Sequence, residues 1–541
     1  MASYKYTYPR VDITTTALSR PVLTENVPDT LVLFAPFRAN IGPVNQFVIC
    51  HSRADFETTF GTIDYTIQGQ NGLNILHWLN NGGTVYAVRV ASENNANNKS
   101  AYTEIELGST TYELFCTKNP GSGYNDFKIQ LSKYTNTSFV VNVYFGSVQM
   151  ERFIVTPDSF EELKDKKNTI SEYVYIDTNK STGAGSTTLD TITKENIFTY
   201  TGDKVTGFTT NFGAVIETPK TLSFKGGSTE TTSQDELIKN ALTYPSSDSS
   251  DSDFRKLLKD SLQYPIDVIL DAGFATETKK AIWNAFNSAE TNSNHIRNDV
   301  FVYYDAFEFS TSSVQPSIPA RNSFYSDIIA TGSTNSYRTS PNAHNAAIYQ
   351  QFYKVKDPYI NTQIFVTPSY FISTMLPYQT ISLNKGYHTP IAGLNNGELS
   401  GVLYLNENPV PSDKETWFTA RVNYAEKDSR QTSFMSQRTL ENGADNSALQ
   451  FINNALMTNI IVKELGILAR EYLFEYNDAI TLSNLRKTLN TYISNYVASR
   501  VLEYAYIDVQ KDEFSPEAID VSINIKYTGT IEVISIDLTI E

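Results

Sequence analysis

Hydrophobic spacing along the chain switches between helical and strand periods, most clearly in residues 74–90 (NILHWLNNGGTVYAVRV). Ile75, Trp78 and Leu79 share one face of a helix, which is the spacing that docks a helix on a sheet. Two glycines follow, and a glycine after the last periodic residue can take the left-handed conformation that ends a helix. Residues 84–90 then alternate as a strand. The segment therefore predicts a helix, a tight turn and a strand.

Further strands and helices indicate an α/β core that is discontinuous in sequence. Residues 47–61 predict an apolar strand followed by a helical turn that a glycine closes. Residues 264–273 and 298–306 predict buried strands on either side of an amphipathic helix, which together form a βαβ unit. Because this unit is expected to complete the sheet begun earlier, we predict a core made of residues 21–95 and 216–380.

A β-rich segment separates the two parts of that core. Between residues 96 and 177 the runs FKIQLSK, FVVNVYFGSV and MERFIVT alternate between polar breaks, which predicts an inserted small β-sandwich or β-barrel. Residues 178–215 are dominated by threonine, serine and glycine, with weak hydrophobic patterning. A surface insertion that faces solvent is expected there.

Residues 381–528 predict a C-terminal unit of two long helices followed by strands. One stripe of the first helix, over about 25 residues, is apolar at Phe451, Ala455, Val462, Leu465, Ala469 and Tyr472. The second helix repeats every four residues, at Leu485, Leu489, Ile493 and Val497. A half-buried strand follows, with apolar positions at Val521, Ile523, Ile525 and Tyr527.

Both ends of the chain read as extended arms, at residues 1–20 and 529–541. The first arm alternates through Tyr4, Tyr6, Val11 and Ile13. The second arm changes phase near Val533, which predicts a bulge, and then carries four aliphatic side chains on one face: Ile534, Ile536, Leu538 and Ile540. A strand with a bare edge templates pairing with another chain. Such a strand pairs either within its own sheet, which is the commoner case, or with a neighbouring molecule.

Composition and charge narrow the classes of function. The length of 541 residues indicates several domains, and 34 tyrosines with 30 phenylalanines favour strands. A formal charge of −16 argues against a chain that binds nucleic-acid phosphates, so no direct nucleic-acid partner is expected. Cys50 and Cys116 are too few for a disulfide framework, which suits a reducing cytosol. No signal peptide and no apolar run of about 18 residues occurs, so no membrane insertion is expected.

No residue pattern predicts catalysis, a cofactor or a metal site. Cys50 and His51 are adjacent, but neighbours in a strand point to opposite faces, so Cys50 is interpreted as a small hydrophobe. Residues 226–233 (GGSTETTS) lack the Gly-Lys-Ser/Thr end of a phosphate-binding loop, and the histidines show no ligand spacing. Asp271 follows a buried strand, where α/β enzymes place catalytic carboxylates. Without a second acid or base at a readable spacing, we interpret Asp271 as a loop cap.

Several stretches resemble the contractile tail sheath family of bacteriophages. Members typically carry Asp-Phe, Phe-Gly and Asn-Gly-Gly before a strand ending Val-Arg-Val, and Arg-Thr-Leu before a long helix. The matching residues here are Asp55, Phe56, Phe60, Gly61, Asn81, Gly82, Gly83, Arg89, Arg438 and Thr439. Residues 119–125 and 384–405 match family segments in part. The chain departs from the family at Arg10, where Pro-Gly-Val is common, and at MTNIIVKE, which replaces an arginine-rich patch.

The resemblance implies a mechanical role. Sheath proteins of this family form hexameric rings stacked around a tail tube, exchange their terminal arms, and contract to drive the tube through the host envelope for genome delivery. The implied partners are further copies of the chain, the tail tube protein, the baseplate and the tail terminator or neck proteins. The implied location is the virion tail, after assembly in the host cytoplasm. Basic residues that could face the tube are Arg486, Lys487 and Arg500.

The expected fold class is thus mixed α/β and multidomain, and the expected role is structural, without enzymatic activity. For Arg89, a late strand position usually means a surface or edge residue, whereas the resemblance implies a structural ion pair. The sheath of a phage-derived, bacteriocin-like contractile injection system is an alternative in the same class. An α/β enzyme with a β accessory domain is an alternative in another class.

Overall fold

The computed structural model is of mixed α/β type and is built from several sheets. Its described residues begin at residue 31 and end at residue 530. The predicted arm at residues 1–20, and residues 531–541 of the second arm, lie outside them. The described residues are 31–92, 95–107, 110–177, 197–209, 213, 216–245, 251–310, 317–330, 337–383, 385–442, 447–512, 515 and 517–530.

The first sheet joins strands that lie on both sides of the β-rich segment. Its order is β2-β3-β1-β13-β14-β17-β21, and the pairs are parallel except for β2 with β3. The predicted βαβ unit is confirmed, because β13 and β14 are parallel neighbours with the helix α8 (Thr276–Phe286) between them in sequence. The strands are β1 (Val32–Phe37), β2 (Val48–Cys50), β3 (Thr84–Arg89), β13 (Val268–Leu270), β14 (Phe301–Asp305), β17 (Ala346–Tyr349) and β21 (Val422–Asn423).

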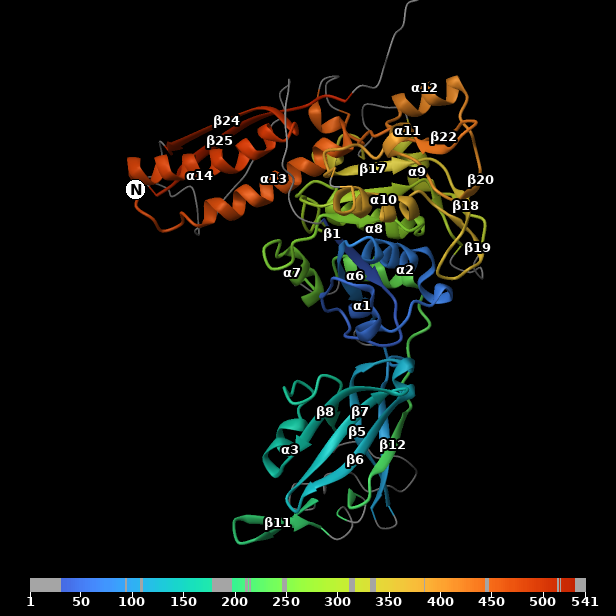
Figure 1. The fold of residues 1–541 in the computed structure, drawn as a ribbon, viewed down its shortest axis with the longest axis vertical. Coiled ribbons are helices and arrows are strands. Elements are labelled where there is room, and N and C mark those ends of the chain that lie inside the picture. Colours follow the sequence, from blue (N-terminus) through green and yellow to red (C-terminus); the bar gives the residue numbers. More distant parts are fainter. Residues whose placement is uncertain are drawn as a thin grey trace, which may run out of the picture.

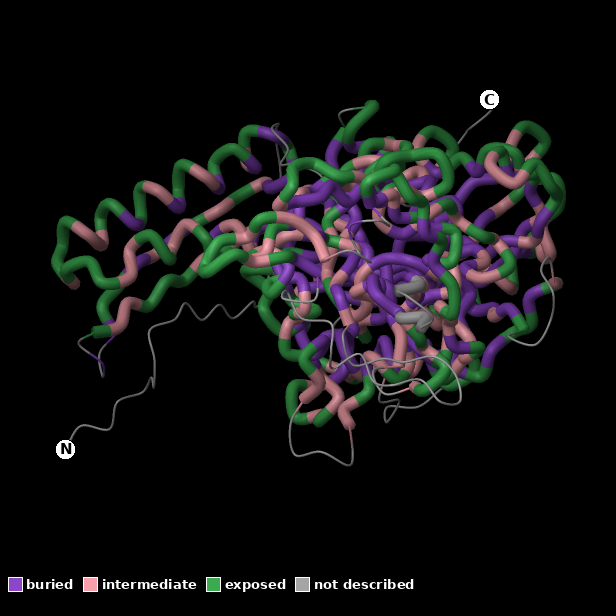
Figure 2. Tube along the Cα trace, turned by 90° about the horizontal axis from the view of Figure 1, so that it is seen from below, coloured by how far each residue is buried: buried purple, intermediate pink, exposed green. Residues whose placement is uncertain are grey.

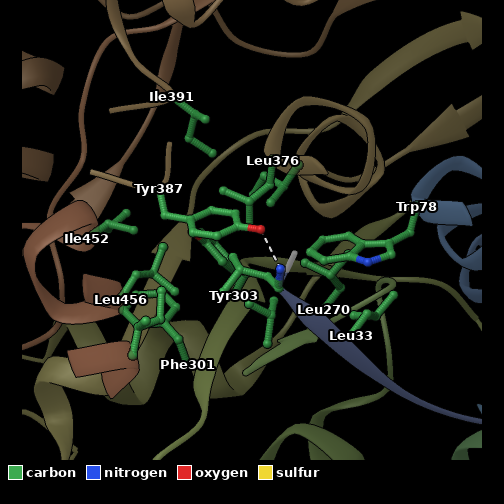
Figure 3. Packing of buried hydrophobic residues seen from close by; sticks show 14 of the residues in the cluster. Leu33, Trp78, Leu270, Phe301, Tyr303, Leu376, Tyr387, Ile391, Ile452 and Leu456 are labelled. Atoms are coloured by element: carbon green, nitrogen blue, oxygen red, sulfur yellow. Dashed lines mark hydrogen bonds between the residues drawn. The ribbon is translucent and has the colours of Figure 1, made fainter. Parts of the chain in front are cut away.

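Helices cover both faces of this sheet (Figure 1). Leu33 and Phe37 of β1 belong to one hydrophobic cluster together with α2 and α10, whereas Phe34 belongs to the opposite cluster, with α6, α8 and α9. Figure 3 shows Leu33, Trp78 and Tyr303 in the first cluster, which continues to Leu456 in the C-terminal region. The helices are α1 (Arg53–Phe60), α2 (Tyr65–Asn80), α6 (Gln234–Leu242), α7 (Asp253–Lys259), α8 (Thr276–Phe286), α9 (Ser323–Ile329), α10 (Ser369–Ile381), α11 (Gly393–Asn396) and α12 (Pro411–Thr419).

The predicted helix, turn and strand near residue 80 are confirmed, and the two glycines have separate reasons. Gly82 has a φ of +85°, which suits glycine at the end of α2. A Cβ on Gly83 would lie 2.3 Å from Nε1 of Trp78, so only glycine fits beside the indole. That Nε1 donates a hydrogen bond to the carbonyl of Thr84 at 3.0 Å. The turn is therefore fixed by packing as well as by backbone conformation.

The second sheet is antiparallel and has the order β8-β7-β6-β12-β4-β5-β9. β12 joins two groups of strands, because Lys220–Ser223 pair with β6 and Phe224 and Lys225 pair with β4. This corrects the prediction that placed residues 220–225 in the core, since β12 belongs to the β-rich unit. The helix α3 (Pro157–Leu163) packs its Phe160 and Leu163 into the same core. The strands are β4 (Ser100–Leu107), β5 (Thr110–Pro120), β6 (Phe127–Thr135), β7 (Ser138–Phe145), β8 (Val148–Val155), β9 (Val174–Ile176) and β12 (Lys220–Lys225).

Residues 197–209 and 213 are the described part of the expected surface insertion at residues 178–215, and most of them are exposed or half-buried. Residues 198–208 form a hairpin of β10 (Phe198–Thr201) and β11 (Lys204–Phe208). Phe198 is fully buried and packs against Phe139 and Phe160 of the second sheet's core. Packing against this core thus buries Phe198, although the composition of the segment alone indicates exposure.

The C-terminal region projects sideways from the body (Figure 1). It contains α13 (Ile452–Arg470), α14 (Ala479–Ala498), β24 (Leu502–Lys511) and β25 (Ile519–Tyr527), so the two predicted long helices and the predicted strand are confirmed. Figure 2 shows a larger share of exposed residues on this projection than in the body.

Smaller sheets complete the body: β15 (Phe307–Glu308) with β16 (Ala320–Arg321), β18 (Tyr353–Lys356) with β19 (Gln363–Val366) and β20 (Val402–Leu405), and β22 (Ala425–Lys427) with β23 (Thr432–Phe434).

Candidate functional site

The strongest candidate for an interaction surface is the two-stranded sheet β24–β25. Its strands are antiparallel, with Ile507 opposite Ile523 and Val509 opposite Val521. Within the described part of the chain, neither strand pairs with a third strand. An isolated two-stranded sheet is marginal in water, and bare edges accept further strands. The sheet therefore has the form of an incomplete one.

One face of this sheet is stabilised by α14. Leu485, Leu489 and Ile493 are buried on that helix, and Ile507 and Val509 of β24 are buried in the same cluster. The helix begins at Asp478, whose side chain accepts hydrogen bonds from the backbone N–H groups of residues 480 and 481. Its four-residue apolar repeat is what the sequence predicts for a helix that covers a sheet.

The point where the chain leaves β25 is held by side-chain contacts. Tyr527 is buried, and its hydroxyl lies 2.8 Å from Oγ1 of Thr458 on α13. Three residues later, Oγ1 of Thr530 accepts a hydrogen bond from Nε2 of Gln437 at 2.9 Å. The direction in which residues 529–541 start is therefore fixed beside Gln437, although Ile534, Ile536, Leu538 and Ile540 lie outside the described residues.

The neighbouring motif residues Arg438 and Thr439 have structural roles. The guanidinium of Arg438 lies 4.8 Å from the ring centroid of Phe418 and 4.4 Å from that of Phe451. Oγ1 of Thr439 donates to the carbonyl of Leu449 at 2.8 Å. These contacts join the segment before α13 to the start of that helix, next to the exit of the second arm.

The amino-terminal motif residues also stabilise local structure. Asp55 forms a capping box with Ser52 at the start of α1, and the hydrogen bond from the Ser52 side chain lowers the pKa of Asp55. Phe56 and Phe60 pack on Phe37, with ring centroids 5.1 and 5.0 Å apart. Gly61 and Asn81 end α1 and α2. None of these residues forms part of a reactive site with the others.

Arg89 is neither a surface residue nor half of a close ion pair. Its side chain is fully buried, and Nη1 donates to the carbonyl of Gly42 at 2.7 Å. Burial lowers the pKa of Arg89 to about 10, and no described carboxylate lies within 4 Å. A Cβ on Gly121 would lie 3.2 Å from Nη2, so Arg89 sits where the loop after β1 meets the β-rich unit. Both sequence expectations for Arg89 were wrong, because the hydrophobic pattern carries no signal for a buried cation.

The three basic residues proposed to face a tube are placed differently from one another. Arg486 is 46% exposed and pairs with Asp508 of β24 at 2.9 Å, so it also ties α14 to the sheet. Lys487 is exposed on the same helix. Arg500 follows α14 with a φ of +58°, and its carbonyl accepts a hydrogen bond from Oγ1 of Thr528 at 2.7 Å. Whether they face a tube stays a prediction.

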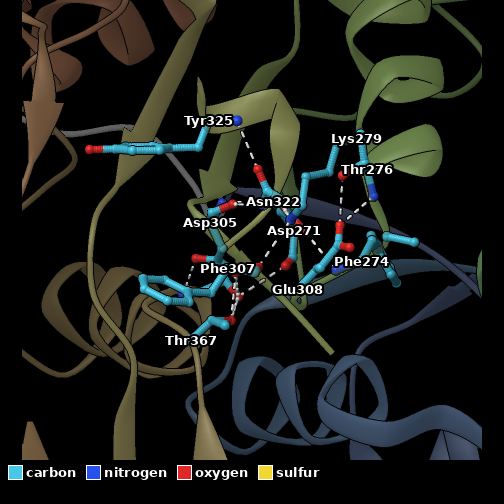
Figure 4. Close-up of polar contacts among 12 residues, drawn as sticks. Asp271, Phe274, Thr276, Lys279, Asp305, Phe307, Glu308, Asn322, Tyr325 and Thr367 are labelled. Carbon is cyan, nitrogen blue, oxygen red and sulfur yellow. Dashed lines mark hydrogen bonds and ion pairs between the residues drawn. The ribbon is translucent and has the colours of Figure 1, made fainter. Parts of the chain in front are cut away.

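A cluster of buried charges lies at the C-terminal ends of β13 and β14 (Figure 4). The carboxylate of Asp271 accepts hydrogen bonds from Nζ of Lys279 and from the backbone N–H of Asp305, the latter at 3.0 Å. Asp305 accepts hydrogen bonds from the hydroxyls of Thr367 and Ser369, at 2.6 and 2.7 Å. Burial and the nearby Asp271 raise the pKa of Asp305 to about 7.

This cluster has the location of an α/β active site but not the access that one needs. Asp271, Lys279 and Asp305 are at most 1% exposed, and their polar atoms are engaged with one another and with the surrounding helices. Asp271 does cap a loop as predicted, since it accepts from the N–H of Phe274 at 2.9 Å, but it also carries the ion pair. Sequence reasoning missed Asp305, although it too ends a buried strand.

The last candidates for chemistry are Cys50, His51 and possible metal ligands. Cys50 is fully buried, and burial raises the pKa of its thiol to about 12, whereas His51 is exposed. No group of three or more His, Cys, Asp or Glu residues among the described residues is arranged to hold a metal ion. No helix in the described part of the chain is long and apolar enough to cross a membrane.

Comparison with known proteins identifies the fold. No protein-family model matches the chain, and no curated protein matches it by sequence. The solved structure of the sheath tail protein Lin1278 from Listeria innocua matches with a TM-score of 0.58 and 11% identity, over 93% of this chain and 93% of that chain. This chain has the sheath tail protein fold. The resemblance stated from the sequence is therefore confirmed at the level of fold.

Two further structures with the sheath fold match along nearly the full length. The sheath tail protein DSY3957 from Desulfitobacterium hafniense matches with a TM-score of 0.48 and 10% identity, over 95% of this chain and all of that chain. The contracted helical sheath of the anti-feeding prophage matches with a TM-score of 0.47 and 10% identity, over 99% of each chain.

Proposed function

We propose that this chain is the repeating subunit of a contractile tail sheath. In this proposal, hexameric rings of the chain stack around a tail tube and contract to drive the tube through a host envelope, delivering a genome. The observation that carries the proposal is the sheath fold shared with Lin1278 over 93% of both chains. The work is mechanical, so it needs no cofactor and no catalytic residue.

The open β24–β25 sheet supports the assembly step. Its two edges, with which no other described strand pairs, can accept the arms of neighbouring copies, 1–20 and 529–541. The candidate contact residues of these arms are Tyr4, Tyr6, Val11, Ile13, Ile534, Ile536, Leu538 and Ile540. Ordering seven residues costs about 7 to 14 kcal/mol. Burying four aliphatic side chains returns about 6 to 12 kcal/mol. One exchanged strand is then marginal alone, whereas many such junctions in a polymer act together.

The remaining partners follow from the same proposal. The tube would meet the basic residues Arg486, Lys487 and Arg500, and the ends of the polymer would meet a baseplate and a terminator or neck protein. The subunit would assemble in the cytoplasm of the bacterial host and function in the virion tail. Arg486 has a double role here, because its pair with Asp508 also stabilises the sheet that receives the arms.

Truncation of the second arm tests the proposal. A chain that ends at Val533 keeps every described element and should fold, but it should not form tubes. Within the full chain, Ile536→Asp should abolish tubes, whereas the matched control Ser535→Asp, on the other face of the same strand, should leave them intact. Electron micrographs and sedimentation report the outcome. Normal polymerisation of the truncated chain would overturn the exchanged-arm proposal.

A further inference from the structure

The turn between α13 and α14 exposes an unusual amount of apolar surface. Phe474 is 90% exposed, Tyr476 is 84% exposed and Ile480 is 70% exposed. We call these three residues the aromatic tip. Phe474 also has a φ of +69°, a conformation that bulky side chains rarely adopt. Holding an aromatic ring in solvent on a strained backbone is unfavourable in an isolated molecule, so the aromatic tip has the character of a docking element.

An apolar groove lies on the three-stranded sheet β19-β18-β20. It has a volume of about 610 Å³, which is within the size range of pockets that bind small molecules. Ile318, Leu403 and Tyr404 are 66%, 53% and 48% exposed at its surface. We call this the aromatic groove, and the residues used below are Ile318, Phe352, Lys354, Phe365, Leu403 and Tyr404.

The aromatic tip and the aromatic groove lie at opposite ends of the molecule. In Figure 1 the turn between α13 and α14 is at the far left, whereas β18, β19 and β20 are at the right of the body. Figure 2, turned about the horizontal axis, shows the same helical projection at the left. One molecule therefore cannot bring the two surfaces together, but two copies can.

The charges around the two surfaces are complementary. Glu471 and Glu475 flank Phe474, and both are exposed. Lys354 lies in the aromatic groove, with Nζ 5.7 Å from the ring centroid of Phe365. Among the described residues, none of these three charged groups has an ion-pair partner within 4 Å. A carboxylate from the turn would meet an unpaired ammonium in the groove.

We propose that the aromatic tip of one copy docks in the aromatic groove of another copy of this chain. The contact is heterologous, because different surfaces of the two copies meet, and heterologous contacts generate rings or helical polymers. The inference rests on the proposed function, since it adds a second junction to the sheath, separate from the exchanged arms. Phe474 and Tyr476 would be the anchor residues, consistent with the dominance of buried aromatics in interfaces.

Cysteine cross-linking tests this contact directly, because the native Cys50 and Cys116 are both buried. Tyr476→Cys and Leu403→Cys chains would be mixed, assembled and oxidised. We expect a covalent dimer at least tenfold more abundant than from the control mixture of Tyr476→Cys with Tyr134→Cys, whose site is also exposed. Tubes without this excess would overturn the docking proposal and leave the sheath proposal standing. Absence of both tubes and dimers would overturn both proposals.

A charge exchange gives a second, independent measurement. Lys354→Glu and Glu475→Lys should each lower the yield of assembled protein several-fold, and combining them should restore it. The control Lys204→Glu, on the exposed β10–β11 hairpin, should leave the yield unchanged. If the yield of the combined variant is as low as the product of the two single effects, a direct contact between these two residues is contradicted.

Discussion

At the residue scale, buried polar groups join the layers of the parallel sheet. Asp271 and Asp305 lie at the ends of neighbouring strands, and Lys279 of α8 forms an ion pair with Asp271. Ser369 of α10 and Gln70 of α2 bring in the helices of one face, with Nε2 of Gln70 donating to Oγ of Ser369 at 2.9 Å. A position that a catalytic carboxylate could occupy is thus used to fix the sheet and its helices.

The raised pKa of Asp305 predicts a pH-dependent stability. Between about pH 4 and pH 7 the unfolded chain loses a proton that folded Asp305 keeps, so the free energy of unfolding should fall as pH rises, and then level off. Buried Asp235, with its pKa raised to about 6, acts in the same direction. Asp305→Asn should remove up to about 4 kcal/mol of this decline.

Urea unfolding between pH 4 and pH 8 measures that effect. The exposed control Asp203→Asn should keep the full decline of the parent chain. A parent chain and an Asp305→Asn variant with identical pH profiles would show that the carboxyl of Asp305 is ionised in both the folded and the unfolded state.

At the scale of elements, α14 provides the platform for the β24–β25 sheet. Leu489 is 1% exposed and lies between two further buried residues of the helix, Leu485 and Ile493. Because one face of a two-stranded sheet must be covered for it to persist, loss of this packing should weaken both the helix and the sheet.

Leu489→Ala should therefore lower the free energy of unfolding by about 2 to 5 kcal/mol, as expected for a buried leucine. It should also reduce tube formation, because the acceptor sheet is less populated. The neighbouring exposed substitution Asn490→Ala serves as the control and should change neither. Denaturant midpoints and micrographs of both variants give the comparison. Equal midpoints would contradict the proposal that packing on α14 stabilises the sheet.

Elements whose cause is local could be predicted from the sequence, and elements whose cause is distant could not. The end of α2 was predictable because its glycines act on adjacent residues. The place of β12 was not, because alternation in KTLSFK identifies a strand without identifying its partners, β4 and β6. The burial of Arg89 and the hydrogen bonds of Asp305 with Thr367 and Ser369 likewise depend on segments far away in sequence.

At the scale of the whole molecule, the β-rich unit is attached through two adjacent crossings of the chain. The backbone N–H of Lys99 donates to the carbonyl of Ser228 at 3.1 Å, and the N–H of Ser228 donates to the carbonyl of Lys99 at 3.0 Å. The carboxylate of Glu230 accepts hydrogen bonds from Ser92, Asn95 and Asn98 at the same place. Entry and exit are therefore side by side.

We expect the body to stay folded when two glycines replace residues 100–227. Lys99 and Ser228 already pair in an isolated β-bridge, so the two glycines have only a short distance to span. In the proposed sheath the shortened chain should still form tubes, but narrower ones, because the arms and their acceptor sheet are retained. Circular dichroism and micrographs give the readout. Aggregation of the shortened chain would show that the body depends on the β-rich unit for folding.

Electron microscopy of the purified full-length protein is the decisive test of whether the chain polymerises into a sheath. We expect hollow tubes or short contracted cylinders with sixfold end views, made of this chain alone. A preparation that remains monomeric at every concentration, with no tube in any field, would contradict it.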